Sequence, residues 1–168
     1  MTRGSELTRG SLVRVAARQA VASIGADMQD RFELQRFVTA QDAGGTYQQA
    51  VAELRRGKKT SHWMWFVFPQ IAGLGHSAMS KRFALSSLAE AREYLAHPVL
   101  GPRLIECAGI LLQNADHNAQ QIFGGIDAQK LRSCMTLFMR AAPEEPVFAR
   151  VLDEYYDGVP DSATDQLL

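Results

Sequence analysis

The stretch WMWFVF at residues 63–68 is an unbroken apolar run that ends at Pro69. Its aromatic and β-branched residues favour a strand, yet periodicity alone cannot separate a buried strand from a buried helix in so short a run. The segments on both sides have helical spacing, so a strand here would have no partner. A helix that is apolar on every side belongs in the protein interior. We therefore predict that residues 63–68 form a buried helix at the centre of the fold.

The surrounding chain shows start and stop signals for several further helices. Thr46 with Gln49 and Ser87 with Glu90 have the spacing of a capping box, in which two side chains satisfy free N–H groups at a helix start. No pair of segments alternates as strands do, so the predicted fold class is all-α. The predicted helices begin at Asp30, Thr46, Ser87, Pro102, Asp127 and Val147.

The composition is typical of one globular domain, with 168 residues, 46% apolar residues and 21% charged residues. Lys and Arg number 18, as do Asp and Glu, so the excess positive charge that general nucleic-acid binding needs is missing. No apolar run approaches the roughly 18 residues of a membrane span. Cys107 and Cys134 fall on apolar faces of predicted helices, which predicts two buried thiols in a reducing cytoplasm rather than a disulfide.

The first 28 residues differ from the rest of the chain. No acidic residue occurs between Glu6 and Asp27, while three arginines recur among Ala, Val and Ser. We predict a basic N-terminal extension over residues 1–28 that is frayed or loosely docked, followed by one multihelical domain over residues 29–168. The composition also resembles an organelle transit peptide or a weak membrane-surface helix, but its apolar positions are mostly Ala.

Six stretches carry a resemblance to a known family. They are FELQRFVTAQ at 32–41, GKKTSHWMWFVFPQ at 57–70, GLGHS at 73–77, YLAHPVLGPRL at 94–104, KLRSCMTLF at 130–138 and DGVPDSAT at 157–164. From about Asp30 to the C-terminus the chain resembles a bacterial family of unknown function, the domain-of-unknown-function 1810 family, sometimes mislabelled calpastatin. The resemblance implies a compact multihelical fold with central helices buried on all sides. It implies no activity.

The strongest candidate for a ligand site is the segment around the apolar run. His62, Trp63, Trp65 and Gln70 combine a titratable ring, two indole donors and an amide beside very apolar residues. Such groups can converge on a ligand, or they can satisfy one another and the backbone inside the core. We predict that a ligand-binding cavity, if this protein has one, lies beside Trp65.

The loop GLGHS at 73–77 is a second candidate, because Ser77 can cap a following helix and leave N–H groups for an anion. Gly75, His76 and Ser77 would form the edge that accepts the anion, with Lys81 or Arg82 one turn later. The alternative is an ordinary glycine turn with a helix cap, since the loop is neither a Rossmann nor a Walker motif.

A third candidate combines the turn at residues 124–127 with Lys130. Its ordinary interpretation is that Asp127 caps a helix. Lys58 and Lys59 are predicted to be solvated, although they could attract an anion. The acidic residues near the C-terminus, Asp161 among them, are also predicted to be solvated.

The sequence predicts no metal site and no cofactor. No two histidines have H-x-x-x-H spacing, no Cys-x-x-Cys pair occurs, and no nucleotide-binding motif is present. His97 precedes Pro98 at a predicted helix end, where the helix dipole favours a cation. His62 and His76 flank the aromatic segment and are the predicted general acid or base, because histidine titrates near neutrality.

These observations favour a cytoplasmic protein that binds a small anionic metabolite through Trp63, Trp65, Gln70, Gly75, Ser77 and Lys130. If it is an enzyme, His62 or His76 would transfer the proton. The alternative is a non-enzymatic protein–protein interaction module in which the aromatic segment is only core. A nucleic-acid binder is the weakest interpretation, since only the basic extension and Lys58-Lys59 favour it.

Overall fold

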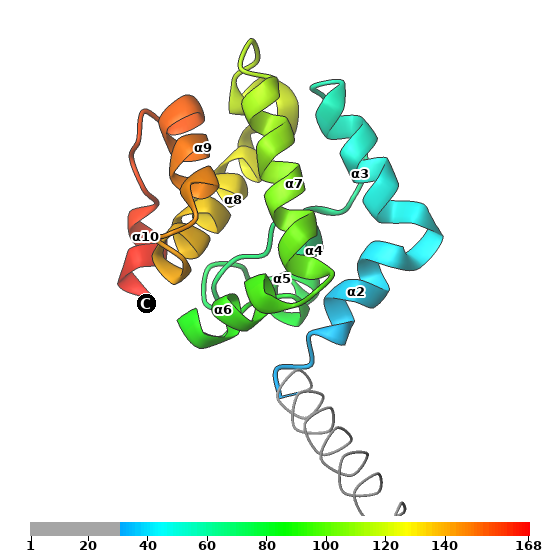
Figure 1. The fold of residues 1–168 in the computed structure, drawn as a ribbon, viewed down its shortest axis with the longest axis vertical. Helices are drawn as coiled ribbons and strands as arrows, with labels where there is room; N and C mark the ends of the chain where they lie inside the picture. The colour runs from blue at the N-terminus through cyan, green and yellow to red at the C-terminus, as the bar shows by residue number, and fades with distance from the viewer. Residues whose placement is uncertain (1–30) are drawn as a thin grey trace, which may run out of the picture. The chain divides into compact units, whose positions relative to one another are not determined.

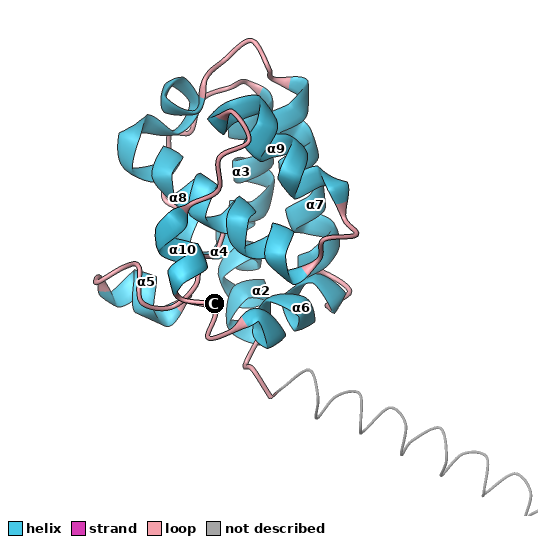
Figure 2. Ribbon diagram, turned by 90° about the vertical axis from the view of Figure 1, so that its left-hand side faces the viewer, coloured by secondary structure: helices cyan, strands magenta, loops and turns pink. Residues whose placement is uncertain are grey.

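The computed structural model describes residues 31–168, of which Gln35–Leu168 form one compact unit. The predicted extension over residues 1–28 lies outside the described residues. Figure 1 shows the course of the chain, and Figure 2 shows that the regular elements of the described part are helices. The helices are α2 (Gln35–Asp42), α3 (Thr46–Arg55), α4 (Met64–Val67), α5 (Ala78–Arg82), α6 (Leu88–Ala96), α7 (Leu100–Gln113), α8 (Ala119–Ala141), α9 (Pro146–Tyr156) and α10 (Ser162–Gln166). The predicted all-α class is confirmed.

The packing of the unit centres on its longest helix. α8 packs against α6, α9 and α10, and α7 packs against α3, α6 and α9. α2 packs against α3 and against the short helix α4. In Figure 1, α9 and α10 lie on one side of the unit, α2 and α3 lie on the other, and α7 lies between them.

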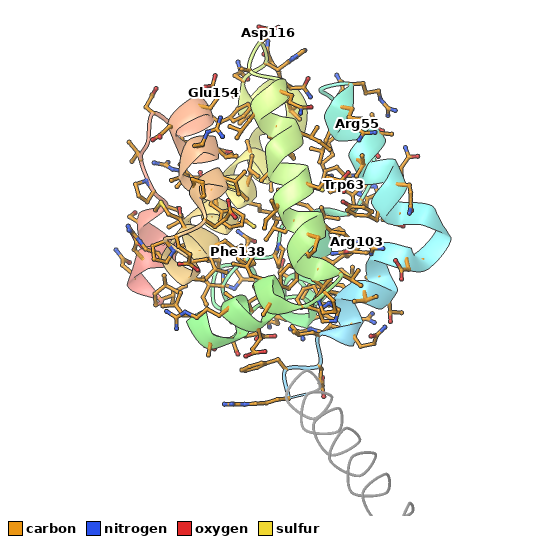
Figure 3. All side chains as sticks on the ribbon, in the orientation of Figure 1. Arg55, Trp63, Arg103, Asp116, Phe138 and Glu154 are labelled. Carbon is orange, nitrogen blue, oxygen red and sulfur yellow. The ribbon has the colours of Figure 1, made fainter. Side chains whose placement is uncertain are left out.

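The apolar run at 63–68 is buried as predicted, but it contains one helical turn rather than a continuous helix. Trp63 and Phe68 have no exposed surface, and the Phe123 ring packs against both at centroid distances of 6.4 and 6.1 Å. Trp63 has non-helical dihedral angles, and Pro69 cannot continue a helical ladder. Beyond Pro69 the chain forms one isolated parallel bridge between Ile71 and Leu85. Figure 3 shows the position of Trp63 among the side chains.

Helix starts are the least accurate part of the sequence prediction. Ser87 caps α6 as predicted, since its Oγ accepts a hydrogen bond from the Glu90 N–H at 3.1 Å. Thr46 is not a cap, because its hydroxyl donates backward to the Ala43 carbonyl at 2.6 Å. The helix expected from Asp30 begins at Gln35. Asp30 itself lies outside the described residues.

The prediction for α8 was wrong at its start. α8 begins at Ala119 and carries a capping box formed by Asn118 and Gln121. At Gly124 the backbone leaves the helical region, with φ 75° and ψ 171°, and the helix continues beyond this break. Asp127 therefore lies inside the helix rather than at its cap, and its Oδ2 is 2.9 Å from Lys59 Nζ.

His97 also differs from its predicted role. It follows α6, but its Nδ1 accepts hydrogen bonds from the N–H groups of Val99 and Leu100 at the start of α7. An accepting nitrogen must be unprotonated, so this position suits neutral imidazole rather than a cation. Burial lowers the pKa of His97 further.

Among the described residues, no single helix is both long enough and apolar enough to cross a membrane, although the bent pair formed by α6 and α7 passes that test by length and composition. Cys107 and Cys134 are free and buried, as predicted.

Candidate functional site

A cavity of about 510 Å³ opens between the loop after Pro69, the part of α8 beyond its break, and α10. This volume lies within the range of small-molecule sites. The residues that line it are Gln70, Leu74, Gly75, Gly125, Ile126, Gln129, Lys130, Ser133, Asp161 and Ala163. The cavity therefore contains Gln70, Gly75 and Lys130, three of the residues predicted from the sequence.

One face of α8 supplies half of this lining. Positions 125, 126, 129, 130 and 133 have the spacing of a single helical face. Gly124 interrupts α8 immediately before this face begins. Ile126 is 78% exposed, which is unusual for a large apolar side chain and places an apolar group at the edge of the cavity.

Asp161 fixes the opposite wall of the cavity. This residue is buried, contrary to the predicted solvated position, and its side chain caps α10. Its carboxylate accepts hydrogen bonds from Gln129 Nε2 at 3.0 Å, Ser133 Oγ at 3.0 Å, Thr164 N at 3.0 Å and Thr164 Oγ1 at 2.6 Å. The Asp161 N–H donates to Thr136 Oγ1 at 2.8 Å. A carboxylate has about four acceptor positions, so this one is almost fully used in holding α10 against α8.

Two polar side chains of the lining keep donors for a ligand. Within residues 31–168, the side-chain amide of Gln70 makes no hydrogen bond. Lys130 Nζ is 3.8 Å from Asp127 Oδ1, a distance that leaves its donors largely unused. Asp127 makes its shorter ion pair with Lys59 instead. Lys130 Nζ also lies 5.4 Å from the centre of the half-buried Trp65 ring, which favours a cation there.

Trp63 belongs to the core rather than to the cavity. Its side chain has no exposed surface, and its indole N–H donates to Glu53 Oε2 at 3.2 Å. Lys59 is also committed to structure, contrary to the prediction that it is solvated. Its Nζ contacts Asp127 and donates to the Ser61 carbonyl at 2.6 Å.

The remaining predicted residues lie outside the cavity lining. His62, His76 and Ser77 are exposed and Trp65 is half-buried, and none of the four lines the 510 Å³ cavity. Ser77 caps α5, since its Oγ accepts from the Ser80 N–H at 3.1 Å, but α5 spans five residues only. The structure therefore gives no geometric support to proton transfer by His62 or His76.

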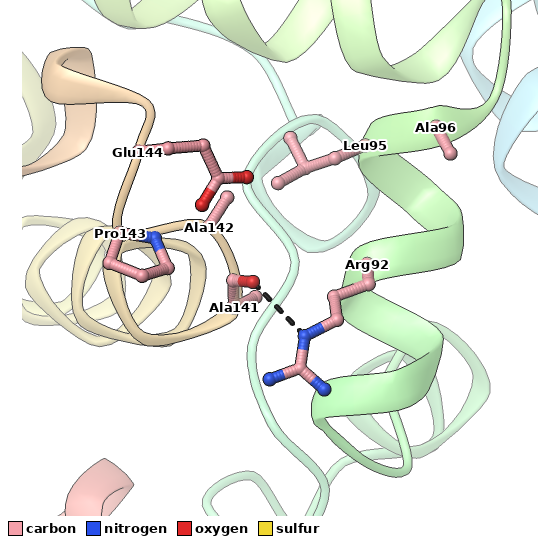
Figure 4. A pocket seen from close by; sticks show the side chains of 7 residues that line it. All are labelled: Arg92, Leu95, Ala96, Ala141, Ala142, Pro143 and Glu144. Atoms are coloured by element: carbon pink, nitrogen blue, oxygen red, sulfur yellow. Dashed lines mark hydrogen bonds between the residues drawn. The ribbon is translucent and has the colours of Figure 1, made fainter.

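A second cavity, of about 600 Å³, lies at the C-terminal end of α8 and contains none of the predicted site residues. Its lining is mostly small and apolar, apart from Arg92 and Glu144. Figure 4 shows these two side chains on different sides of the cavity and the hydrogen bond from Arg92 Nε to the Ala141 carbonyl, 3.1 Å long. That bond caps the end of α8, which is a structural role. Among the described residues no group of three His, Cys, Asp or Glu side chains could hold a metal ion.

Residues 31–168 match the family model described as "Protein of unknown function (DUF1810)". The chain belongs to this family. Four stretches that carry the DUF1810 resemblance meet at the 510 Å³ cavity, since they supply Gln70, Gly75, Lys130 and Asp161 among others. This convergence joins Gln70 and Ala163, which lie 93 positions apart in the sequence.

The chain is also similar to a solved structure, that of the conserved hypothetical protein Rv1873 from Mycobacterium tuberculosis. The two chains are 49% identical and superpose with a TM-score of 0.80, over 83% of this chain and 98% of the other. No curated protein matches the chain. These comparisons establish the family and the fold without assigning an activity.

Proposed function

We propose that this DUF1810 protein binds a small organic anion, a carboxylate or a phosphorylated metabolite, in the cavity lined by Gln70, Lys130 and Asp161. The observation that supports the proposal is which polar groups of the lining are already hydrogen-bonded to the protein. Asp161 has most of its acceptor positions used by protein donors, whereas Gln70 and Lys130 retain donors. A ligand that satisfies these groups must bring acceptors, and an anion does so best.

The apolar part of the lining supports an organic ligand rather than a bare inorganic ion. Leu74, Ile126 and Ala163 lie in the same cavity as Lys130. Apolar walls with a few convergent polar groups are the usual composition of a metabolite site. The carbon skeleton would contact these three side chains while the anionic group binds Lys130.

We propose ligand binding at this cavity and no chemical reaction. The lining contains no His or Cys, and its hydroxyl and carboxyl groups are occupied: Ser133 Oγ donates to Asp161 Oδ2 at 3.0 Å. The alternative of a pure interaction module receives partial support, because Trp63, Phe66 and Phe68 are packed in the core. Trp65 is only half-buried and stacks against a cavity cation, which favours the binding proposal.

Ligand-dependent thermal stability tests this proposal. The wild-type protein is screened against organic acids and sugar phosphates, and hits are quantified by calorimetric titration. A ligand at 100 times its dissociation constant adds about 2.7 kcal/mol to stability. Lys130→Met should weaken binding about tenfold or more, since a hydrogen bond to a charged group is worth about 1.5–3 kcal/mol. Lys58→Met removes an exposed lysine outside the cavity and should leave affinity unchanged.

The proposal fails if no member of these classes stabilises the wild-type protein. It also fails if the Lys130→Met variant binds every hit as tightly as the wild type does.

A further inference from the structure

A smaller cavity, of about 130 Å³, adjoins the first one. Its lining includes Gln70, Gly73, Gly75, Ser80 and Lys81. Gln70 and Gly75 line both cavities, so the two spaces are neighbours that share this pair. Lys130 and Asp161 do not line the smaller cavity.

The two residues shared by the cavities are held by close packing and by a backbone hydrogen bond. A Cβ atom at Gly75 would lie 2.4 Å from the Ser80 Cβ, so the absence of a side chain is what allows the loop to pass here. The backbone carbonyl of Gln70 accepts a hydrogen bond from the Leu85 N–H at 2.9 Å. This anchoring holds the Gln70 backbone while its side-chain amide makes no hydrogen bond within residues 31–168.

Each cavity contains one lysine that has donors to spare. Lys130 lines the larger space and Lys81 lines the smaller one. Lys81 makes no ion pair or side-chain hydrogen bond with any residue from 31 to 168, and the lining of the smaller cavity contains no acidic side chain. Each of the two cavities that share Gln70 therefore contains one positive group.

We propose, on the basis of the proposed function, that the ligand is a linear organic dianion whose two charged ends bind Lys130 and Lys81. Its chain passes Gln70 and Gly75, and the Gln70 amide donates to one of its anionic ends. Glycine at position 75 keeps Ser80 in its place in the lining of the smaller cavity, since any larger residue would displace it. The two lysines select a ligand with two anionic groups over one with a single group.

The experiment compares matched acids of equal chain length: pentanoate with glutarate, hexanoate with adipate, and octanoate with suberate. Affinities are measured by calorimetric titration at constant ionic strength for the wild type and for Lys81→Met, Lys130→Met and Lys58→Met. In at least one pair the dicarboxylate should bind the wild type about two- to fivefold more tightly than the monocarboxylate, the ratio expected of one ion pair near a protein surface.

Lys81→Met should remove this advantage and leave monocarboxylate affinity unchanged, because its side chain is exposed and contributes only to the smaller cavity. Lys130→Met should weaken both members of each pair, and Lys58→Met should weaken neither. Equal affinities within every pair would overturn the dianion proposal, and so would a dicarboxylate advantage that survives in Lys81→Met. In either case, binding that is weakened by Lys130→Met would still support the proposed function. Absence of binding by all six acids, together with a blank screen of sugar phosphates, overturns both.

Discussion

The indole N–H of Trp63 donates to Glu53 Oε2 across 3.2 Å, and both side chains lie fully within the core. The same carboxylate accepts from the N–H of Ser61 at 2.7 Å, the hydroxyl of Ser61 at 2.5 Å and the hydroxyl of Thr60 at 2.9 Å. The N–H of Thr60 is a fifth donor. One side chain of α3 thus holds the loop that leads into α4, and a buried negative charge is compensated by hydrogen bonds.

Glu53→Gln should destabilise the protein by about 3 kcal/mol, because an amide cannot accept from all five donors and leaves buried groups without partners. Urea unfolding followed by tryptophan fluorescence measures this loss. Glu154→Gln is the matched control, since Glu154 is exposed, and should change stability by less than about 0.5 kcal/mol. An equal effect of the two substitutions would show that the hydrogen bonds to Glu53 contribute nothing.

Glu53 should also make stability depend on pH. Burial by itself raises the pKa of this carboxyl, but the hydrogen bonds from Ser61 and Thr60 outweigh burial and lower its pKa from 4.5 to about 2. A carboxyl whose pKa is lower in the folded than in the unfolded state stabilises the fold above the unfolded pKa. This contribution, of about 3 kcal/mol, should therefore be complete above pH 4.5 and disappear as the pH falls toward 2.

The measurement is the free energy of unfolding of wild type and Glu53→Gln between pH 6 and pH 3. The wild type should lose more stability than the variant over this interval, so the difference between the two proteins narrows in acid. Parallel curves would contradict the lowered pKa.

Two glycines of α7 should respond in opposite ways to alanine. A Cβ atom at Gly101 would lie 1.9 Å from the Leu95 carbonyl oxygen, whereas one at Gly109 would meet nothing within 4 Å. Gly101→Ala should therefore cost about 3 kcal/mol or more, because backbone must move where α6 and α7 join. Gly109→Ala should stabilise by about 0.5–1 kcal/mol through helix propensity. Chemical unfolding of both variants measures the two changes in the free energy of unfolding. Similar changes in the two variants would contradict the close approach of Gly101 to the Leu95 carbonyl.

The cysteines should be unreactive in the folded protein. Burial raises the pKa of the Cys107 thiol to about 12 and that of Cys134 well above its ordinary value, so the reactive thiolate is scarce at neutral pH. An aromatic disulfide reagent at pH 8 should label neither thiol in native protein and both in guanidinium. Rapid labelling of native protein would show that one of these helices opens readily.

Several features could be predicted from residues close together in the sequence. The apolar run at 63–68 was predicted to be buried because its six consecutive apolar side chains, four of them aromatic, are unfavourable in water, and the structure buries most of them. Ser87 and Ser77 form caps with residues three positions away, an interaction that local spacing specifies. The local pattern at Asp127 was misleading, because the capping box of Asn118 and Gln121 starts α8 earlier and the helix resumes after the break at Gly124.

The candidate site could be predicted only in part. The residue types of Gln70, Gly75 and Lys130 indicated a binding role, and the structure places the three in one cavity. Glu53 and Asp161 were not recognised as buried, because an isolated acid in a sequence looks like any solvated acid. The only signal for Glu53 was its place on a helical pattern that otherwise buries apolar residues.

The sequence by itself determined the helical class, the approximate place of most helices and which apolar segments must leave water, because periodicity, caps and apolar content act over a few positions. The tertiary structure alone decided which buried polar groups meet. Asp161 bonds to Ser133 across 28 positions, and Gln41 bonds to the Phe66 carbonyl across 25. Such partners are selected by the packing of helices that are distant in the chain, and the cavity exists where that packing leaves α8, α10 and the loop after Pro69 apart.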